Sequence, residues 1–448
     1  MNNNYLKRII DADLQEWKDS GHRKPLILRG ARQVGKSSAV RELGSKFFNF
    51  LEINFENKDH IGAKQVFERH SDPRLICDEL SAIYETPIVA GRTLLFLDEV
   101  QACPDAISSL RYFYEEMPEL HVIAAGSLLE FALQKIPSFA VGRVRSMYMY
   151  PFSFEEFLWA MKRNILLEKL KIATPQNPLS EEIHSKLKEL LLRFMVIGGM
   201  PEVVSKYASG GSLLDCQNIL DELTETFYND FAKYKQRVPA TRLEEIFSAI
   251  IAQTGQKFTF SKAHTSANQM QIKESIELLK MAGLVYAVTH TSANGLPLAA
   301  ETNPHYRKLI ILDTGIYQRF LRLELANLLL EEKIEQINKG ALSEMFVGTE
   351  LVKSLNNRLP AELYYWQREK KGSAAEIDYL IQQEQNIVPV EVKAGTKGSM
   401  QSMFLFLTEK QQQYGIRCSM ENFGEFQNVK IYPLYAVEKI VNLKINKI

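Results

Sequence analysis

Residues 30–37 follow the pattern G-x-x-x-x-G-K-[ST], directly after the apolar run Leu26–Leu28. In this pattern the glycines let successive backbone N–H groups face one anion, the lysine reaches the β- and γ-phosphates, and the hydroxyl ligates Mg²⁺. The spacing therefore predicts a loop that binds a nucleoside triphosphate, between a strand and a helix whose positive N-terminal end points at the phosphates. The nucleotide-binding residues that we expect are Gly30, Ala31, Arg32, Gln33, Val34, Gly35, Lys36, Ser37 and Ser38.

Two carboxylates end a second apolar run, where Leu94–Leu97 continues into Asp98 and Glu99. This is typical of a buried parallel strand with acids at its carboxyl end. Ligands of open α/β sheets bind beyond such ends, so we expect Asp98 to face the Mg²⁺ held by Ser37, and Glu99 to polarise a hydrolytic water. The alternative without a catalytic role is a strand that ends in two solvated acids.

A third strand pattern, Leu120–Ala125, stops at Gly126-Ser127. Parallel strands of one sheet bring their carboxyl ends to the same edge. Ser127 is therefore a candidate sensor of the γ-phosphate.

A second group of acids, with a lysine, lies near the C-terminus. Glu391 and Lys393 would share one face of a strand, beside Asp378 on the preceding strand. Two close carboxylates repel, which favours a divalent metal, and a nearby lysine helps to deprotonate a metal-bound water, as in nucleases. A helix over residues 340–351 would add Glu344. The same E-x-K spacing recurs elsewhere, so a cluster of fold-supporting ion pairs stays an open alternative; the other occurrences are Glu56/Lys58, Glu331/Lys333 and Glu369/Lys371.

Composition sets limits on the class of protein. A chain of 448 residues predicts roughly two to four domains. Lys plus Arg equals Asp plus Glu at 54 each, so any contact with nucleic acid needs a local patch. The four cysteines lack paired spacing, which argues against a zinc site or a disulfide framework and fits a reducing cytosol. No run of sequence approaches the length of a membrane span and the start is unlike a secretory signal, so we expect a cytoplasmic protein without a membrane anchor.

Periodicity and turn residues divide the chain into four parts. Residues 1–150 combine an amphipathic helix over 5–18 with alternating strands and helices, the pattern of a parallel-sheet nucleotide domain. Residues 151–239 are mostly helical and suggest a lid or connector. Residues 240–315 place short helices before a hairpin, as in a winged helix. Residues 316–448 contain the second acidic group.

The winged-helix pattern has more than one reading. Its second helix would offer Gln269, Gln271 and Lys273 to a DNA groove. A winged helix that binds a protein, or one that serves as a spacer, stays open.

Short motifs spread along the chain are highly specific in combination. They are Gly30–Ser37, Leu97–Gln101, Ala125–Leu129, Val141–Val144, Pro151–Phe157, Gly198–Glu202, Leu312–Gly315, Glu376–Asp378 and Val390–Lys393. Together they resemble bacterial and archaeal AAA-superfamily ATPases that carry a C-terminal domain of unknown function, over nearly the whole chain. The resemblance implies an α/β multidomain protein with an AAA-like P-loop core, a winged helix and a C-terminal fold similar to restriction endonucleases. It leaves nuclease activity open.

The resemblance also directs attention to arginines. In AAA-like enzymes a guanidinium from the same or an adjacent subunit stabilises charge on the transferring phosphoryl group. Arg143, with Arg145 beside it, is the candidate for this role, and a homo-oligomer would follow from an arginine in trans. The rival role is a structural ion pair with the helix that begins at Phe152.

These observations together predict an ATPase that requires ATP and Mg²⁺. We expect its nucleotide state to rearrange the winged-helix and nuclease-like domains, and expect it to act on DNA or on a protein partner that works with DNA. The alternative is a regulatory signal-transduction ATPase whose C-terminal domain is a catalytically inactive interaction module.

Overall fold

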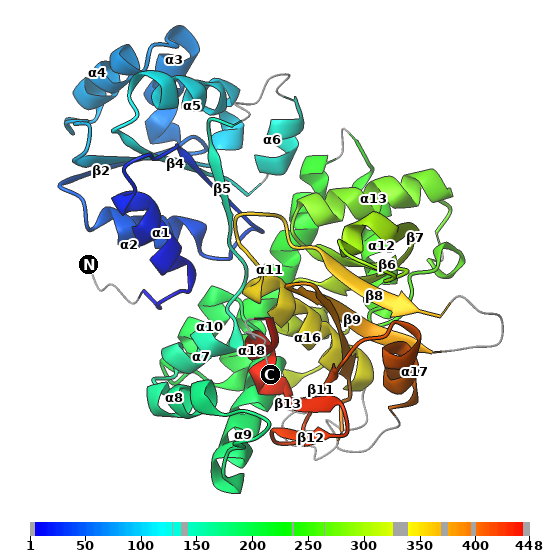
Figure 1. Ribbon diagram of the computed structural model, residues 1–448. Helices are drawn as coiled ribbons and strands as arrows, with labels where there is room; N and C mark the ends of the chain where they lie inside the picture. The colour runs from blue at the N-terminus through cyan, green and yellow to red at the C-terminus, as the bar shows by residue number, and fades with distance from the viewer. Residues whose placement is uncertain are drawn as a thin grey trace. The chain divides into compact units, whose positions relative to one another are not determined.

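The computed structural model describes residues 5–127, 129–135, 142–234, 237–263, 265–325, 339–368, 375–395 and 400–441 (Figure 1). These residues fall into two compact units. The first consists of Met1–Pro151, Met281–Gly283 and Asn356–Pro360, and the second of Phe152–Lys280, Leu284–Leu355 and Ala361–Ile448. Leu128 and Val141 of the motifs, and the E-x-K pairs at 331/333 and 369/371, lie outside the described residues.

The first unit is built on a five-stranded sheet in the order β2-β3-β4-β1-β5, with every neighbouring pair parallel. Its strands are β1 (Leu26–Arg29), β2 (Asn49–Asn54), β3 (Thr93–Asp98), β4 (His121–Ala125) and β5 (Arg145–Tyr148). Its helices are α1 (Ile10–Asp19), α2 (Lys36–Gly44), α3 (Ile61–Arg69), α4 (Pro73–Ile83), α5 (Pro104–Glu116) and α6 (Leu129–Lys135).

Helices cover both faces of this sheet, which explains why its central strands are continuous apolar runs. Figure 1 shows α3, α4 and α5 on one side of the sheet and α1 and α2 on the other. All six residues of β3 are buried, as are all five of β4. The expected strands are confirmed to within a residue or two, whereas the lead-in helix begins at Ile10 rather than near Tyr5.

The order of the strands decides where their ends lie. Strand β4 lies between β1 and β3, with Ala125 opposite Leu28 and Ala124 opposite Leu97. The segments that follow these three parallel strands therefore lie along one edge of the sheet. The phosphate-loop motif, Glu99 and Ser127 lie in these segments, and Asp98 is the last residue of β3.

The second unit begins with a helical region, as the pattern of residues 151–239 predicts. Its helices are α7 (Phe154–Ala160), α8 (Asn164–Ile172), α9 (Glu181–Ile197), α10 (Pro201–Ala208) and α11 (Leu213–Phe231). The later helices are α12 (Ala240–Ala252), α13 (Gln269–Met281), α14 (Thr314–Phe320), α16 (Lys339–Ser354), α17 (Gln401–Glu409) and α18 (Val437–Val441).

One eight-stranded mixed sheet runs through the rest of this unit, in the order β12-β13-β11-β10-β9-β8-β6-β7. Its strands are β6 (Val285–Thr291), β7 (Thr302–Ile311), β8 (Leu363–Gln367), β9 (Glu376–Gln383), β10 (Asn386–Val392), β11 (Gly415–Ser419), β12 (Gly424–Phe426) and β13 (Val429–Pro433). The hairpin of the expected winged helix is β6–β7, and β6 pairs in parallel with β8. Residues on the two sides of the boundary expected at 315 therefore share one sheet, and the winged-helix assignment stays a prediction.

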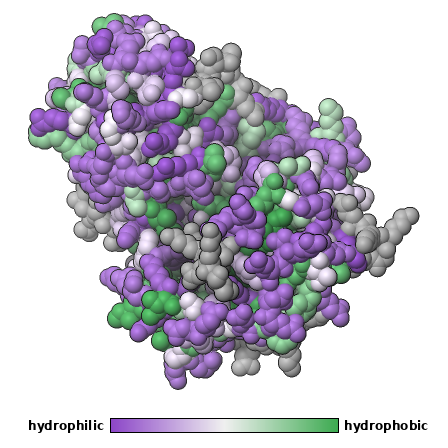
Figure 2. Space-filling view, in the orientation of Figure 1, coloured by the Kyte–Doolittle hydropathy of each residue, from purple (hydrophilic) through white to green (hydrophobic). Residues whose placement is uncertain are grey.

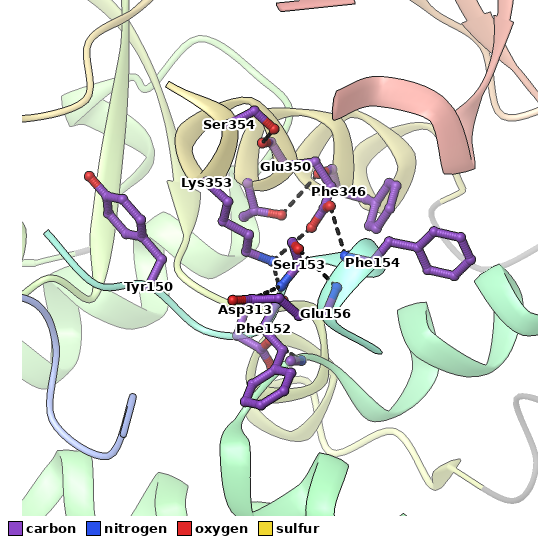
Figure 3. Close-up of polar contacts among 12 residues, drawn as sticks. Tyr150, Phe152, Ser153, Phe154, Glu156, Asp313, Phe346, Glu350, Lys353 and Ser354 are labelled. Carbon is purple, nitrogen blue, oxygen red and sulfur yellow. Dashed lines mark hydrogen bonds and ion pairs between the residues drawn. The ribbon is translucent and has the colours of Figure 1, made fainter. Parts of the chain in front are cut away.

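Three of the motifs with no obvious chemistry meet inside this unit. The N–H of Phe152 donates to the carbonyl of Gly199 over 2.7 Å, and the N–H of Gly199 donates to Asp313 Oδ2 over 2.6 Å. Figure 3 shows Glu350 and Lys353 of α16 reaching the start of α7. Glu350 Oε2 accepts from the N–H of Phe154 at 3.0 Å, so this carboxylate helps to cap the helix.

Within the described residues, no helix is both long enough and apolar enough to cross a bilayer. On the face drawn in Figure 2, hydrophobic residues form small separate patches among hydrophilic ones.

Candidate functional site

The phosphate-loop motif forms a tight turn between β1 and α2. Gly30 has φ +137°, and a Cβ at this position would lie 2.1 Å from the carbonyl oxygen of Met149. Gln33 and Gly35 also have positive φ. The loop therefore needs glycine at Gly30 for close approach of another backbone segment, and it stores strain at Gln33.

Lys36 is buried at the start of α2, and its ammonium faces the loop itself. Its Nζ donates to the carbonyl oxygens of Gly30 and Ala31, at 2.8 and 2.7 Å. Burial lowers the pKa of Lys36 to about 8, against the opposite effect of Glu99 and Asp98. A phosphate that entered the loop would offer this cation a stronger, charged partner than the two carbonyls.

Ser37 and Asp98 come together where α2 begins and β3 ends. The hydroxyl of Ser37 donates to Oδ2 of Asp98 over 2.8 Å. Burial raises the pKa of Asp98, and the hydrogen bond from Ser37 opposes that effect. A hydroxyl and a carboxylate at this distance are hard oxygen ligands of the kind that Mg²⁺ takes, so these residues fit the metal that the motif implies.

Glu99 follows in a left-handed conformation, with φ +47° and ψ +43°. For a residue other than glycine this conformation costs about 1–2 kcal/mol. Its Oε2 accepts from the N–H and the Oγ of Ser127, at 3.1 and 3.3 Å, and from Nε2 of Gln101 at 2.7 Å. The carboxylate is thus fixed at the edge of the sheet where the phosphate loop lies.

Arg8, which precedes α1, stabilises the phosphate loop by hydrogen bonds to backbone carbonyls. Its side chain is buried, with Nη1 2.9 Å from the carbonyl of Val34 and Nη2 2.6 Å from that of Tyr150. The guanidinium therefore ties the phosphate loop to the segment after β5.

The candidate arginine finger, Arg143, forms an ion pair within the first unit. Its Nε contacts Oε1 of Glu115 on α5. Arg143 therefore pairs with α5, in place of the expected partner, the helix that begins at Phe152. The Arg143 side chain is 40% exposed, which leaves much of it accessible to solvent.

The C-terminal acids surround a lysine that the sequence did not single out. Lys308 of β7 is 1% exposed, and its Nζ lies 2.8 Å from Glu344 Oε1 and 3.6 Å from Asp378 Oδ1. It also pairs with Glu376 Oε1. Glu391 instead pairs with Lys393, at 2.7 Å. The four expected residues are thus divided between two ion-pair groups on adjoining elements.

Electrostatics in the Lys308 cluster follow from burial and from the excess of acids. Burial alone would lower the pKa of Lys308, but Glu344, Asp378 and Glu376 raise it above its usual value. Burial raises the pKa of Glu344 to about 8, although Lys308 acts in the opposite direction. Within the part of the chain that the structure describes, no group of three His, Cys, Asp or Glu side chains is arranged to hold a metal ion. The second metal site stays a prediction, and this arrangement does not favour it.

Comparisons with protein families agree with the geometry of the first site. Residues 22–158 match the model of a family described as AAA domain. Most of the matched residues lie in the first unit, where the parallel sheet fits the core of a P-loop ATPase. Residues 188–327 and 339–437 match two families described only as domains of unknown function, DUF8612 and DUF4143. The restriction-endonuclease-like fold of the C-terminal part therefore has no support from these matches.

The solved structures that match this chain are distant in sequence, and the TM-scores of the three described below are under 0.5. A Walker-type ATPase of Pyrococcus abyssi is 17% identical, with a TM-score of 0.46, over 72% of this chain and 97% of that one. The ORC1 protein of Aeropyrum pernix in complex with DNA is 12% identical, with a TM-score of 0.29, over 73% and 96%. A signal transduction ATPase with numerous domains from Pyrococcus horikoshii is 13% identical, with a TM-score of 0.27, over 77% and 48%. No curated protein matches the chain.

Sequence reasoning missed three residues of these sites. Gln101 stood in a quoted motif, and its position just after the two acids was the available signal. Arg8 and Lys308 gave no local signal, since their partners lie far away along the chain.

Proposed function

We propose that this chain binds ATP with Mg²⁺ at its AAA domain and hydrolyses it. The 2.8 Å contact between Ser37 Oγ and Asp98 Oδ2, beside the buried ammonium of Lys36, carries the proposal. It joins the last residue of the phosphate-loop motif to the acid that ends β3. A turn that served only to connect β1 with α2 would need neither that acid nor a buried lysine.

Each residue has a distinct part in the proposed reaction. Lys36 would exchange its two carbonyl partners for the β- and γ-phosphates. Ser37 and Asp98 would hold Mg²⁺. Once bound, Mg²⁺ would neutralise the charge that develops on the phosphates. Glu99 would orient a water toward the γ-phosphorus and accept its proton, and Ser127 would donate to the γ-phosphate.

The test is release of inorganic phosphate from ATP by the full chain, with Mg²⁺ and with excess chelator. We expect turnover only with Mg²⁺. A Ser37→Ala variant should lose most turnover, because the hydroxyl that contacts Asp98 is absent. Turnover that is equal with chelator, or unchanged in this variant, would contradict the proposed site.

We include DNA in the proposal as a partner whose effect on ATP turnover has to be tested. Its support from the expected recognition helix is slight, since Gln271 and Asn268 hydrogen-bond to each other's backbone at the start of α13. Turnover should therefore be measured with single- and double-stranded DNA at two salt concentrations. Stimulation that falls with salt would support a DNA partner.

The second candidate is a regulatory ATPase switch with a catalytically inactive C-terminal module. The cluster around Lys308 favours this candidate, because a buried cation already lies among the acids that a nuclease would need for metal. Absence of DNA stimulation and of cleavage, with intact ATP turnover, would support it.

A further inference from the structure

The side chain of Gln101 reaches back from the short turn Val100–Ala102 to the carboxylate of Glu99. Its Nε2 donates to Glu99 Oε2 over 2.7 Å and contacts Glu56 Oε1 over 3.3 Å. A carboxamide carries its two N–H donors on Nε2, whereas its oxygen only accepts. Because both neighbours are carboxylates, the favourable orientation of the amide places Nε2 toward them.

The other end of the amide is fixed by close packing. Oε1 of Gln101 is buried without a hydrogen-bond partner among the described residues. It faces Gly126, where a Cβ would lie only 2.0 Å from this oxygen. Burying an unpaired carbonyl oxygen is unfavourable. The contact of Nε2 with Glu99 is the interaction that offsets this cost.

Ser127 and Gln101 hold the same oxygen of Glu99 but differ in what else they would contact. Ser127 lies two residues beyond the end of β4, the strand between β1 and β3, where a γ-phosphate would compete for its N–H and hydroxyl. Gln101 follows Glu99 itself, and its second contact is another acid. Gln101 is therefore the donor that would stay on Glu99 when Ser127 turned to phosphate.

We infer that Gln101 is a positioning residue for Glu99 in ATP hydrolysis. The inference rests on the proposed function. Nε2 of Gln101 fixes Oε2 of Glu99, so the strained turn presents the carboxylate in one orientation to the edge of the sheet. Displacement of a catalytic group by about 1 Å costs on the order of 100-fold in rate.

Two variants test this role. Gln101→Leu removes the donor and keeps an approximately equal volume, and Gln101→Glu keeps the shape but places a third carboxylate beside Glu99 and Glu56. We expect both to lower kcat by about tenfold or more, with the KM and the Kd for ATP changed by less than about threefold. Gln65→Leu, on the exposed side of α3, is the matched control and should hydrolyse ATP like the wild type.

A double-mutant cycle separates positioning from packing. If Gln101 acts through Glu99, then Gln101→Leu should cause no further fall in the residual rate of Glu99→Gln. An equal further fall would overturn the inference, and so would an unchanged or an increased kcat in the single variants. If Gln101→Leu melts well below the wild type, the isosteric Gln101→Glu decides the question.

The result also separates this inference from the proposed function. A wild-type chain that releases no phosphate from ATP would overturn both. A wild-type chain that is active, with Gln101 variants that match it, would overturn the positioning role alone.

Discussion

The ammonium of Lys308 lies 2.8 Å from Oε1 of Glu344, inside the second unit of the chain. The two residues come from β7 and α16, elements that the expected domain boundary at 315 would separate. A lysine with almost no exposure is kept charged here by a surplus of acids. The cluster therefore holds β7 and α16 together, and its removal should change the stability of the second unit.

Loss of the cation should destabilise the second unit. In Lys308→Met three acids lose their shared partner, and an unpaired buried charge costs about 3–5 kcal/mol. Chemical denaturation should show this loss, while Kd for ATP at the AAA domain stays near the wild-type value. Unchanged stability would mean that the cluster is not held by Lys308.

Glu344 should lower the stability of the wild type as the pH rises from about 4.5 to about 8, because the pKa of Glu344 is raised in the folded state, chiefly by burial. The folded state then binds a proton that the unfolded state has released, so the slope of stability with pH is negative in this range. Glu344→Gln should flatten this slope in melting experiments between pH 5 and pH 8. Burial and Glu155 raise the pKa of Glu438 to about 9. Glu438 therefore contributes a negative slope of the same size in the wild type and in the variant, so the comparison stays valid. An identical slope in the variant would contradict the assignment.

Metal gives an independent check on the same cluster. In a Ser37→Ala background without nucleotide, Mg²⁺ or Mn²⁺ should leave the melting temperature unchanged, since Lys308 occupies the place among the acids. A rise in melting temperature that is lost in Asp378→Ala, together with cleavage of DNA or RNA, would support a metal-dependent nuclease site at these acids.

Lys36→Ala should abolish useful affinity for ATP. The variant deletes the cation that would offset the charge of the β- and γ-phosphates. Titration with a fluorescent ATP analogue is the measurement, and Lys64→Ala, at a half-buried lysine of α3, is the control. Binding at the wild-type level in Lys36→Ala would contradict the nucleotide site.

Glu99→Gln should keep ATP binding and lose turnover, by on the order of 10²–10⁴-fold. The amide keeps the shape of the side chain but does not accept a proton from water. Single-turnover hydrolysis and equilibrium binding, measured side by side, separate the two effects. Turnover at the wild-type rate would remove Glu99 from the mechanism.

Arg143 can be examined through its ion-pair partner. Glu115→Ala breaks the same ion pair as Arg143→Ala, together with the pair between Glu115 and Arg111, but leaves the guanidinium of Arg143 in place, so it is a control for loss of the ion pair. If Arg143 stabilises the transition state, kcat should fall in Arg143→Ala alone, with little change in nucleotide affinity. A lower melting temperature in both variants, with normal turnover, would assign Arg143 to structure.

The sequence was most informative where a function depends on neighbours along the chain. The strands β1, β3 and β4 could be predicted because each is a continuous apolar run that stops at polar residues, and the phosphate-loop spacing is local. The partners of Lys308 could not be predicted, since pairing of β7 with the rest of the sheet depends on contacts over a long span of sequence. Arg8 was missed for the same reason, because its two acceptors are backbone carbonyls that carry no sequence signal.

The shared eight-stranded sheet limits where this chain can be divided into fragments. The two regions of unknown function meet between residues 327 and 339, yet β6 and β8 on either side of that gap are hydrogen-bonded neighbours. A fragment that ended there would expose the unpaired edge of β6. Unpaired strand edges pair with other chains, so this fragment would tend to aggregate. We therefore expect the two regions to fold and to be expressed only as a single piece.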